Sequence, residues 1–211
     1  MNLHRTTGAP DWAAVKPRNR NVWQHIAAST YGIATLSNIV TFGGFALVVI
    51  GLFYLLNHEY LLGAVLLAVG RAADILDGWL AEVTGTKSPL GELLDASLDK
   101  VGTFLTLGVM FVAGIAPWWI IVLLLLPHIV ITFVTMIAVQ HKQQLHPSRA
   151  GKLSMATVWV SLVGFVLMKI LDVADVSVLG VFTYAVAFIS VFLGCFAARG
   201  YFRDAIRKHF K

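Results

Sequence analysis

Long apolar stretches separated by short polar connections dominate the chain. Six stretches of about twenty residues suit the hydrocarbon thickness of a bilayer. They cover residues 33–56, 60–83, 91–114, 117–140, 152–171 and 176–199. Because lipid offers no hydrogen-bond partners, the backbone groups of each stretch must be satisfied within it, so each stretch is expected to be a helix. The pattern predicts an all-α integral membrane protein with six transmembrane helices.

Composition agrees with this fold class. Of the 211 residues, 58% are hydrophobic and 13% are charged, and the mean hydropathy is +0.78. Soluble domains carry about 25% charged residues, so a soluble globular domain, a disordered chain and a secreted disulfide scaffold are excluded. The single Cys195 lies in an apolar run and can form no internal disulfide. No linker rich in Pro, Gly or Ser divides the chain, and we predict one domain over residues 1–211.

The helical bundle of residues 33–199 is flanked by a polar N-terminal segment (1–32) and a basic tail (200–211). Within the N-terminal segment, aromatic and basic residues are interspersed: Trp12, Lys16, Arg18, Arg20 and Trp23. This mixture predicts a helix that lies in the membrane interface, and Pro17 would start or break it. A solvated tail anchored by one tryptophan is the alternative interpretation.

Basic residues gather on one side of the predicted bundle. Fifteen of the sixteen lysines and arginines lie in the N-terminal segment, in or beside the second and fourth connections, or in the tail; Lys169 alone lies on the other side. The positive-inside rule therefore places both termini in the cytoplasm of a multi-pass protein, which we assign to the inner (plasma) membrane of the cell. This topology and attraction to anionic headgroups explain the net charge of +5 without a nucleic-acid partner.

Acidic residues concentrate in the second and third predicted helices. Six of the eleven acids lie between residues 74 and 99, although an intramembrane carboxylate costs roughly 2.5–3.5 kcal/mol and marks a functional site by default. Asp74 and Asp77 are three residues apart and Asp95 and Asp99 are four apart, so each pair shares one helix face. Both pairs lie roughly 6–14 Å from the connection between their helices. We expect the four carboxylates to converge on one pocket in the cytoplasmic half of the bilayer.

Four anions in a low-dielectric pocket cannot all remain ionised unaided. They can share protons, as in a relay, or they can bind cations. Two divalent ions would balance their charge, and oxygen-only ligation suits Mg²⁺ or Mn²⁺. Simple pairing with Arg71, Lys87 and Lys100 would leave too few bases for the acids and would not explain their common depth. Two metal ions held together are a usual device for clamping the oxygens of a phosphoryl displacement.

The spacing of these residues resembles the motif of the CDP-alcohol phosphotransferase (CDP-alcohol phosphatidyltransferase) family. That motif reads D-x2-D-G-x2-A-R-x8-G-x3-D-x3-D. Seven of its eight fixed positions are present, as Asp74, Asp77, Gly78, Ala81, Gly91, Asp95 and Asp99. The resemblance extends to six spans, cytoplasmic termini and a basic N-terminal segment, and it also suggests a homodimer.

The resemblance implies a reaction and roles for the acids. Members of the family transfer a substituted phosphate group from a CDP-linked donor, usually CDP-diacylglycerol, to an alcohol, and they release CMP in phospholipid biosynthesis. By this likeness Asp74 and Asp95 would each contact both of two metal ions, Asp77 one of them and Asp99 the other. Asp99 would also accept the proton of the attacking hydroxyl. The active site would face the cytoplasm.

The same likeness implies substrate contacts, each of which has a structural alternative. Gly78 and Gly91 would admit the nucleotide where a Cβ would collide, or they pack helices closely. Ser88 would contact the donor, or it starts a helix. Asn38 and Thr41 resemble the N-x2-T that lines the family's nucleotide site, or they join helices by hydrogen bonds.

Two further positions bear on the substrates. Arg149 and Lys152 resemble a basic segment near the acceptor site, where cations would bind a phosphorylated alcohol; topology alone is the alternative. Glu82 stands where the family has an arginine. A carboxylate cannot neutralise phosphate, so Arg71, Lys87 or Lys100 would have to supply the missing charge, or Glu82 marks a different donor or acceptor.

We therefore predict a membrane enzyme whose acceptor is glycerol 3-phosphate or inositol phosphate. A cation- or proton-coupled transporter that uses the same acids is the principal alternative, although the last three spans carry no matching acids. A membrane prenyltransferase, which also uses D-x2-D pairs and Mg²⁺, would require more helices than this chain can form.

Overall fold

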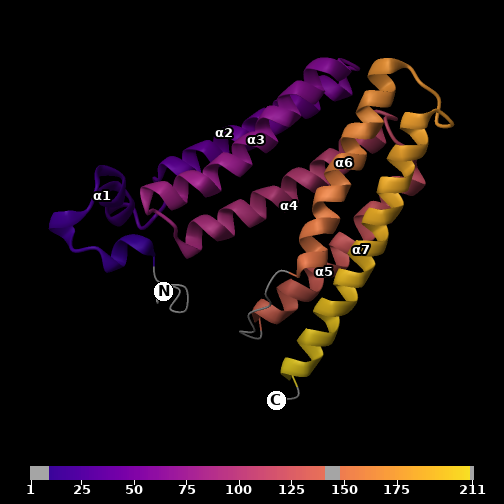
Figure 1. The fold of residues 1–211 in the computed structure, drawn as a ribbon. Helices are drawn as coiled ribbons and strands as arrows, with labels where there is room; N and C mark the ends of the chain where they lie inside the picture. Colours follow the sequence, from indigo (N-terminus) through magenta and orange to yellow (C-terminus); the bar gives the residue numbers. More distant parts are fainter. Residues whose placement is uncertain (1–9, 141–147, 210–211) are drawn as a thin grey trace. The chain divides into compact units, whose positions relative to one another are not determined.

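The computed structural model describes residues 10–140 and 148–209 (Figure 1). Within these ranges the chain is helical and has no β-strand. Two short 3-10 helices, η2 (Asp11–Ala14) and η3 (Pro17–Asn19), come first. They are followed by α1 (Val22–Ser29), α2 (Leu36–Leu56), α3 (Tyr60–Thr84), α4 (Pro89–Val112), α5 (Trp118–Gln140), α6 (Arg149–Leu171) and α7 (Val178–His209). Residues 1–9 of the predicted N-terminal segment, residues 141–147 of the fourth connection and residues 210–211 of the tail lie outside the described residues.

Helices α2 to α7 occupy the six apolar stretches that hydropathy marks. Their bounds differ from the predicted ones by at most three residues, except that α7 continues beyond residue 199 to His209. By length and composition, α2, α5, α6 and α7 are able to cross a membrane. Helices α3 and α4 do not meet that criterion within the described residues, and they are the two that contain the acidic cluster.

The chain divides into two compact units, Met1–Thr106 and Leu107–Lys211. In the first unit α2 and α3 pack with their backbones in close approach. A Cβ on Gly51 would lie 3.0 Å from the carbonyl oxygen of Gly63, and one on Gly44 would lie 3.0 Å from that of Gly70. Small residues permit this close packing of apolar helices, which positions the acidic part of α3 against the start of α2.

The N-terminal segment packs on the connection between α3 and α4, residues 85–88. Gly85 caps the end of α3, and its φ of 64° is in the left-handed region that glycine adopts without strain. Trp12 is only 6% exposed, and a Cβ on Gly32 would lie 2.7 Å from its ring and 3.1 Å from the Ser88 hydroxyl. Gly32 is therefore required for this packing.

The predicted N-terminal helix is replaced by three short elements. Pro17 opens η3, as expected of a residue that fits the first turn of a helix. Helix α1 begins with a capping box, in which the Asn21 side chain accepts from the Gln24 backbone and the Gln24 side chain accepts from the Asn21 backbone. This interruption follows from Pro17, which cannot continue a helix that starts before it.

The second unit contains α5, α6 and α7, and α7 packs against both of the others. Ser154 of α6 and Ser190 of α7 donate to each other's backbone carbonyl oxygens, at 3.0 Å in both directions. Gly194 lies beside Pro127 of α5, which would be 2.8 Å from an added Cβ. Small residues thus bring the three helices of this unit together.

Candidate metal and ligand site

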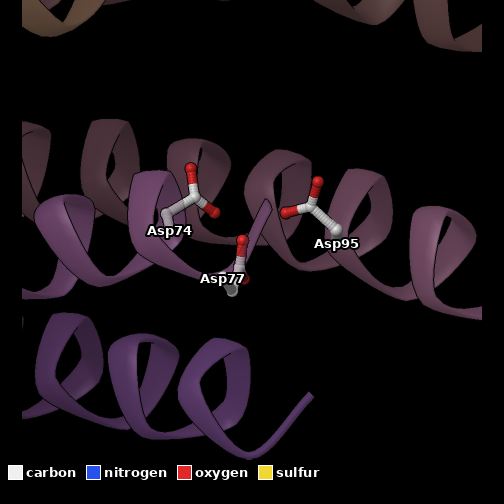
Figure 2. A group of neighbouring side chains, drawn as sticks. All are labelled: Asp74, Asp77 and Asp95. Atoms are coloured by element: carbon white, nitrogen blue, oxygen red, sulfur yellow. The ribbon is translucent and has the colours of Figure 1, made fainter. Parts of the chain in front are cut away.

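Three carboxylates converge between α3 and α4. Asp74 and Asp77 lie one turn apart on α3, and Asp95 lies near the start of α4. One ligand oxygen from each lies within 4.8 Å of the others. Figure 2 shows the three side chains turned toward a common space. The structure therefore brings together three of the four predicted metal ligands.

Hydroxyl groups of α2 hold Asp77 in place. Thr41 Oγ1 donates a hydrogen bond to Asp77 Oδ2, and Ser37 Oγ donates to the backbone oxygen of Asp77 at 2.8 Å. Ser37 and Thr41 are four residues apart, so they share one face of α2. Asp77 is 3% exposed; Thr41 supplies a hydrogen bond to its buried carboxylate, and Ser37 supplies one to its backbone carbonyl oxygen.

Asp99 is arranged differently from the expectation that all four acids meet. Its Oδ1 accepts a hydrogen bond from Arg71 Nη1 at 2.5 Å, and Arg71 Nη2 also lies 3.4 Å from Asp74 Oδ2. Asp99 is one helical turn beyond Asp95 on α4, and Arg71 is nearly one turn before Asp74 on α3, so the two meet at the same level of the helix pair. Opposite charge at this level draws Asp99 to the guanidinium rather than to the other three carboxylates.

The three converging carboxylates fit a divalent cation. Arg71 forms ion pairs with Asp74 and Asp99, and the three converging carboxylates carry more negative charge than this one guanidinium can balance. Their oxygens are the ligand type that Mg²⁺ and Mn²⁺ prefer. The donor set is therefore compatible with a metal ion, and the acidic character of the group is not explained by pairing alone.

A pocket adjoins the carboxylates at the end of the first unit where α2 begins, α3 ends and α4 begins. Asp77 and Asp95 form part of its wall. All six predicted substrate residues of the first unit also line it: Asn38, Thr41, Gly78, Ala81, Ser88 and Gly91. We refer to this space as the α2–α4 pocket.

The two motif glycines occupy different surroundings in the α2–α4 pocket. Apart from the neighbouring backbone of α3 itself, a Cβ on Gly78 would meet no described atom within 4 Å, so its α-carbon faces open space. A Cβ on Gly91 would lie 3.2 Å from the Ser88 hydroxyl and 3.4 Å from Asn38 Oδ1. Close packing thus accounts for Gly91, whereas no packing contact accounts for Gly78.

Asn38 and Ser88 both make structural hydrogen bonds at the wall of the pocket. Asn38 Nδ2 donates to the backbone oxygens of Gly32 and Ile33, at 3.1 and 2.9 Å. Ser88 Oγ accepts from the backbone of Gly91 at 2.9 Å, which is the helix-start role considered for it. These contacts fix the positions of both side chains and leave them on the pocket surface.

Five further residues line the pocket besides these acids and predicted substrate residues: Thr35, Ser37, Thr86, Lys87 and Glu92. The four-residue spacing of Ser37 and Thr41 is a signal that could have identified Ser37. Thr35 caps α2 by accepting from the Asn38 backbone at 3.1 Å, so its presence follows from the start of that helix. Glu92 lies three residues before Asp95 on α4, so helical spacing could have identified it. Thr86 and Lys87 depend on the path of the connection between α3 and α4, which no periodic pattern predicts.

Arg149 and Lys152 lie in the first turn of α6, where both side chains are exposed. Ser148 caps this helix by accepting from the Gly151 backbone at 3.0 Å, and the Ser148 N–H donates to the Tyr201 hydroxyl at 3.2 Å. These residues belong to the second compact unit, whereas every residue of the α2–α4 pocket belongs to the first.

The chain matches a known family over most of its length. The family model described as CDP-alcohol phosphatidyltransferase covers residues 34–196, from just before the start of α2 into α7. The chain belongs to this family. CDP-alcohol phosphatidyltransferases depend on divalent cations, in agreement with the acidic group between α3 and α4. Family membership and four membrane-capable helices identify a multi-pass membrane protein.

Curated relatives share parts of the CDP-alcohol phosphatidyltransferase region. The chain is 26% identical over 104 residues to an archaetidylinositol phosphate synthase of Pyrococcus horikoshii, which is 49% of this chain and 55% of that protein. It is 39% identical over 59 residues to the enzyme of the same name from Aeropyrum pernix, covering 28% of this chain and 30% of that one. An uncharacterized protein of Aquifex aeolicus is 35% identical over 77 residues, with 35% and 39% covered. The chain thus spans about half, or less, of the relatives it matches.

Proposed function

We propose that this protein transfers a phosphatidyl group, or a similar substituted phosphate, from a CDP-linked lipid such as CDP-diacylglycerol to an alcohol, releasing CMP in phospholipid biosynthesis. One observation carries the proposal. The carboxylates of Asp74, Asp77 and Asp95 converge beside a pocket that contains every predicted substrate residue of the first unit. A site for cations next to a site for a polar ligand is what transfer from a nucleoside diphosphate requires.

Two divalent ions, Mg²⁺ or Mn²⁺, are the proposed cofactors. Asp74, Asp77 and Asp95 would hold them, together with Asp99 after its carboxylate leaves Arg71. When bound, such ions neutralise the charge of a diphosphate and of the departing phosphate. The hydroxyl of Thr41 orients Asp77 for this role, because it occupies one of the two carboxylate oxygens.

The chain's own residues position the reactants and move one proton. The α2–α4 pocket would bind the cytidine nucleotide, and the open space at Gly78 would admit it close to α3. Asp99 would accept the proton of the acceptor hydroxyl. A bond forms between the acceptor oxygen and the phosphorus that carries the lipid, the phosphoanhydride bond to CMP breaks, and CMP leaves with its electron pair.

Inositol phosphate is the preferred acceptor in this proposal, and glycerol 3-phosphate is the second choice. Two relatives are named archaetidylinositol phosphate synthases, which supports an inositol phosphate. Arg149 and Lys152, exposed at the start of α6, would bind the acceptor's phosphate group.

The topology we propose has six transmembrane helices in one domain, both termini in the cytoplasm and the α2–α4 pocket facing the cytoplasm of a cell-membrane homodimer. Helices α3 and α4 have 25 and 24 residues, and at 1.5 Å per residue each is about 36 Å long, enough to cross a bilayer core. Lys87 and the basic N-terminal segment lie at the pocket end, which supports a cytoplasmic position for it. The N-terminal segment, with α1, would rest at the interface.

Release of CMP is the direct test of this function. The full chain in lipid nanodiscs, supplied with CDP-diacylglycerol, Mn²⁺ and a panel of alcohols, should release CMP only with a matching acceptor. Asp95→Asn should reduce the rate more than about 100-fold, since even residues that only orient metal ligands commonly contribute 10- to 100-fold. Asp172→Asn, at the exposed end of α6, is the matched control and should leave the rate unchanged.

Two results would contradict the proposal. The first is an absence of CMP release by the wild-type protein with every donor and acceptor, although the protein binds Mn²⁺. The second is an Asp95→Asn variant as active as the control. Proton or metal flux without CMP release would instead support the transporter.

A further inference from the structure

The α2–α4 pocket lacks positive charge for a ligand that carries phosphates. Three acids line it, Asp77, Glu92 and Asp95, and Lys87 is the one basic side chain among its described lining residues. A cation bound by the acids neutralises part of a diphosphate, but a donor phosphate also needs hydrogen-bond donors from the protein. Within this pocket, Lys87 is the only side chain that can provide a charged donor.

Lys87 lines the pocket, and hydrogen bonds from the N-terminal segment hold its backbone in place. Its carbonyl oxygen accepts from the Asp11 N–H at 3.0 Å. The preceding residues are held in the same way: Asn21 Nδ2 donates to the Thr84 oxygen at 3.1 Å and Gln24 Nε2 to the Gly85 oxygen at 3.4 Å. Since all three hydrogen bonds use backbone carbonyls, the position of the lysine does not depend on its own side chain.

The other two basic residues of this helix pair are not available to the pocket. Arg71 is engaged by Asp74 and Asp99, and it does not line the pocket. Lys100, which follows Asp99 on α4, does not line it either. From the sequence, Arg71, Lys87 and Lys100 are all candidates for the positive charge that Glu82 does not supply. Of these three, only Lys87 lines the pocket.

Glu82 has a role toward Lys87 in this arrangement. Glu82 Oε1 lies 3.4 Å from Lys87 Nζ, and the two side chains are 65% and 37% exposed. An ion pair this exposed contributes little to stability, because solvent screens it and the side chains lose freedom. Lys87 can therefore exchange the carboxylate for a phosphate oxygen at little cost, while Glu82 keeps the ammonium group close to the pocket in the absence of ligand.

We propose that Lys87, positioned by Glu82 and by the backbone contacts of the N-terminal segment, binds the phosphate groups of the CDP-linked donor and replaces the charge of the arginine that Glu82 displaces. This assignment rests on the proposed function for the identity of the donor. It makes Lys87 a substrate-binding residue and Glu82 a positioning residue.

Binding of nucleotides with different numbers of phosphates tests the assignment. The full chain in lipid nanodiscs with Mn²⁺ is titrated by calorimetry with CDP, CMP and cytidine. Lys87→Gln should weaken CDP binding about tenfold, the effect of one lost charge-assisted hydrogen bond, and should change cytidine binding by less than about twofold. Lys87→Arg should restore CDP binding, and Mn²⁺ affinity should be unchanged in both variants. Lys16→Gln removes an exposed lysine of the N-terminal segment and should have no effect.

Equal loss of CDP and cytidine binding in Lys87→Gln would show that the residue only maintains the pocket, and unchanged CDP binding would show that it does not touch the phosphates; each result overturns the assignment. The two proposals also fail separately. Wild-type protein that releases CMP while Lys87→Gln binds CDP normally contradicts the role of Lys87 alone. Protein that binds CDP through Lys87 but transfers nothing from any CDP-linked lipid contradicts the reaction alone.

Discussion

The two compact units use buried polar side chains in different ways. In Leu107–Lys211, Ser154 and Ser190 donate to each other's backbone oxygens across α6 and α7. In Met1–Thr106, the hydroxyls of Ser37 and Thr41 both donate to Asp77, whose carboxylate lies beside those of Asp74 and Asp95. The two serines of the second unit thus join α6 and α7, whereas Ser37 and Thr41 of the first unit orient an acid.

Glycines differ between the units in the same way. Gly194 of α7 is surrounded by Pro127 and Ser154, whereas Gly78 of α3 faces open space beside the acids. Burial and small size alone therefore do not distinguish packing from function in a membrane bundle. The surroundings of each residue do distinguish them: Gly194 contacts neighbouring helices, whereas Gly78 lines the α2–α4 pocket, where we propose that a ligand binds.

The largest effect is expected from filling the space at Gly194. A Cβ there would lie 2.8 Å from Pro127 Cβ and 3.0 Å from Ser154 Oγ. Gly194→Val should lower the free energy of unfolding by roughly 1–3 kcal/mol, the usual cost of overpacking, as measured by denaturant titration in detergent. Gly200→Val, on the same helix with no atom within 4 Å, is the control. Equal destabilisation of both variants would show that loss of glycine, not the contact, is responsible.

An intermediate effect, on binding rather than stability, is expected at Gly78. Gly78→Ala should raise the free energy of unfolding slightly, since alanine is favoured over glycine in a helix by roughly 0.5–1 kcal/mol. It should weaken CDP binding about tenfold, because one methyl group would occupy space that the nucleotide needs. Gly108→Ala also places a methyl group in open space, but outside the pocket, and should leave CDP binding unchanged. Normal CDP affinity in Gly78→Ala would mean that the nucleotide does not approach α3 there.

The smallest effect is expected at Glu82. Glu82→Gln removes the carboxylate that keeps the Lys87 ammonium group close to the pocket, so CDP binding at low ionic strength should weaken by about two- to fivefold, within the range of an exposed ion pair. At about 1 M salt the Debye length falls to about 3 Å and the difference between Glu82→Gln and the wild-type protein should disappear. Asp204→Asn breaks another exposed ion pair, with Arg203, and should not affect CDP. Tighter CDP binding in Glu82→Gln would show that Glu82 competes with phosphate for the lysine and does not position it.

The positions of the long helices could be predicted from sequence because the hydropathy pattern and the bilayer thickness determine them together. Helices α2 to α6 begin and end within three residues of the predicted spans. The extension of α7 to His209 was missed, since the basic residues after residue 199 end an apolar stretch without ending a helix. The N-terminal segment was also beyond prediction in detail, because its structure depends on contacts with residues 84–87 rather than on a periodic pattern.

In the candidate site, too, some features could be predicted from the sequence and others could not. Helical periodicity and the motif spacing bring Asp74, Asp77 and Asp95 together, as predicted. The pairing of Asp99 with Arg71 depends on side-chain direction across two helices, which sequence spacing does not give. Likewise, only the folded connection shows that Lys87 faces the pocket while Lys100 does not line it. The metal-binding and catalytic roles of these residues remain predictions.

Hydrogen bonds from the N-terminal segment hold the α3–α4 connection by its backbone, so mutations in this region have two different kinds of effect. Asp11, Asn21 and Gln24 all bind backbone oxygens, so mutation of Glu82 or Lys87 can alter charge without moving the chain that bears it. Mutation of Asn21 or Gln24 would instead shift that chain and everything it carries. The charge of the pocket can therefore change by single side-chain exchanges on an unchanged backbone.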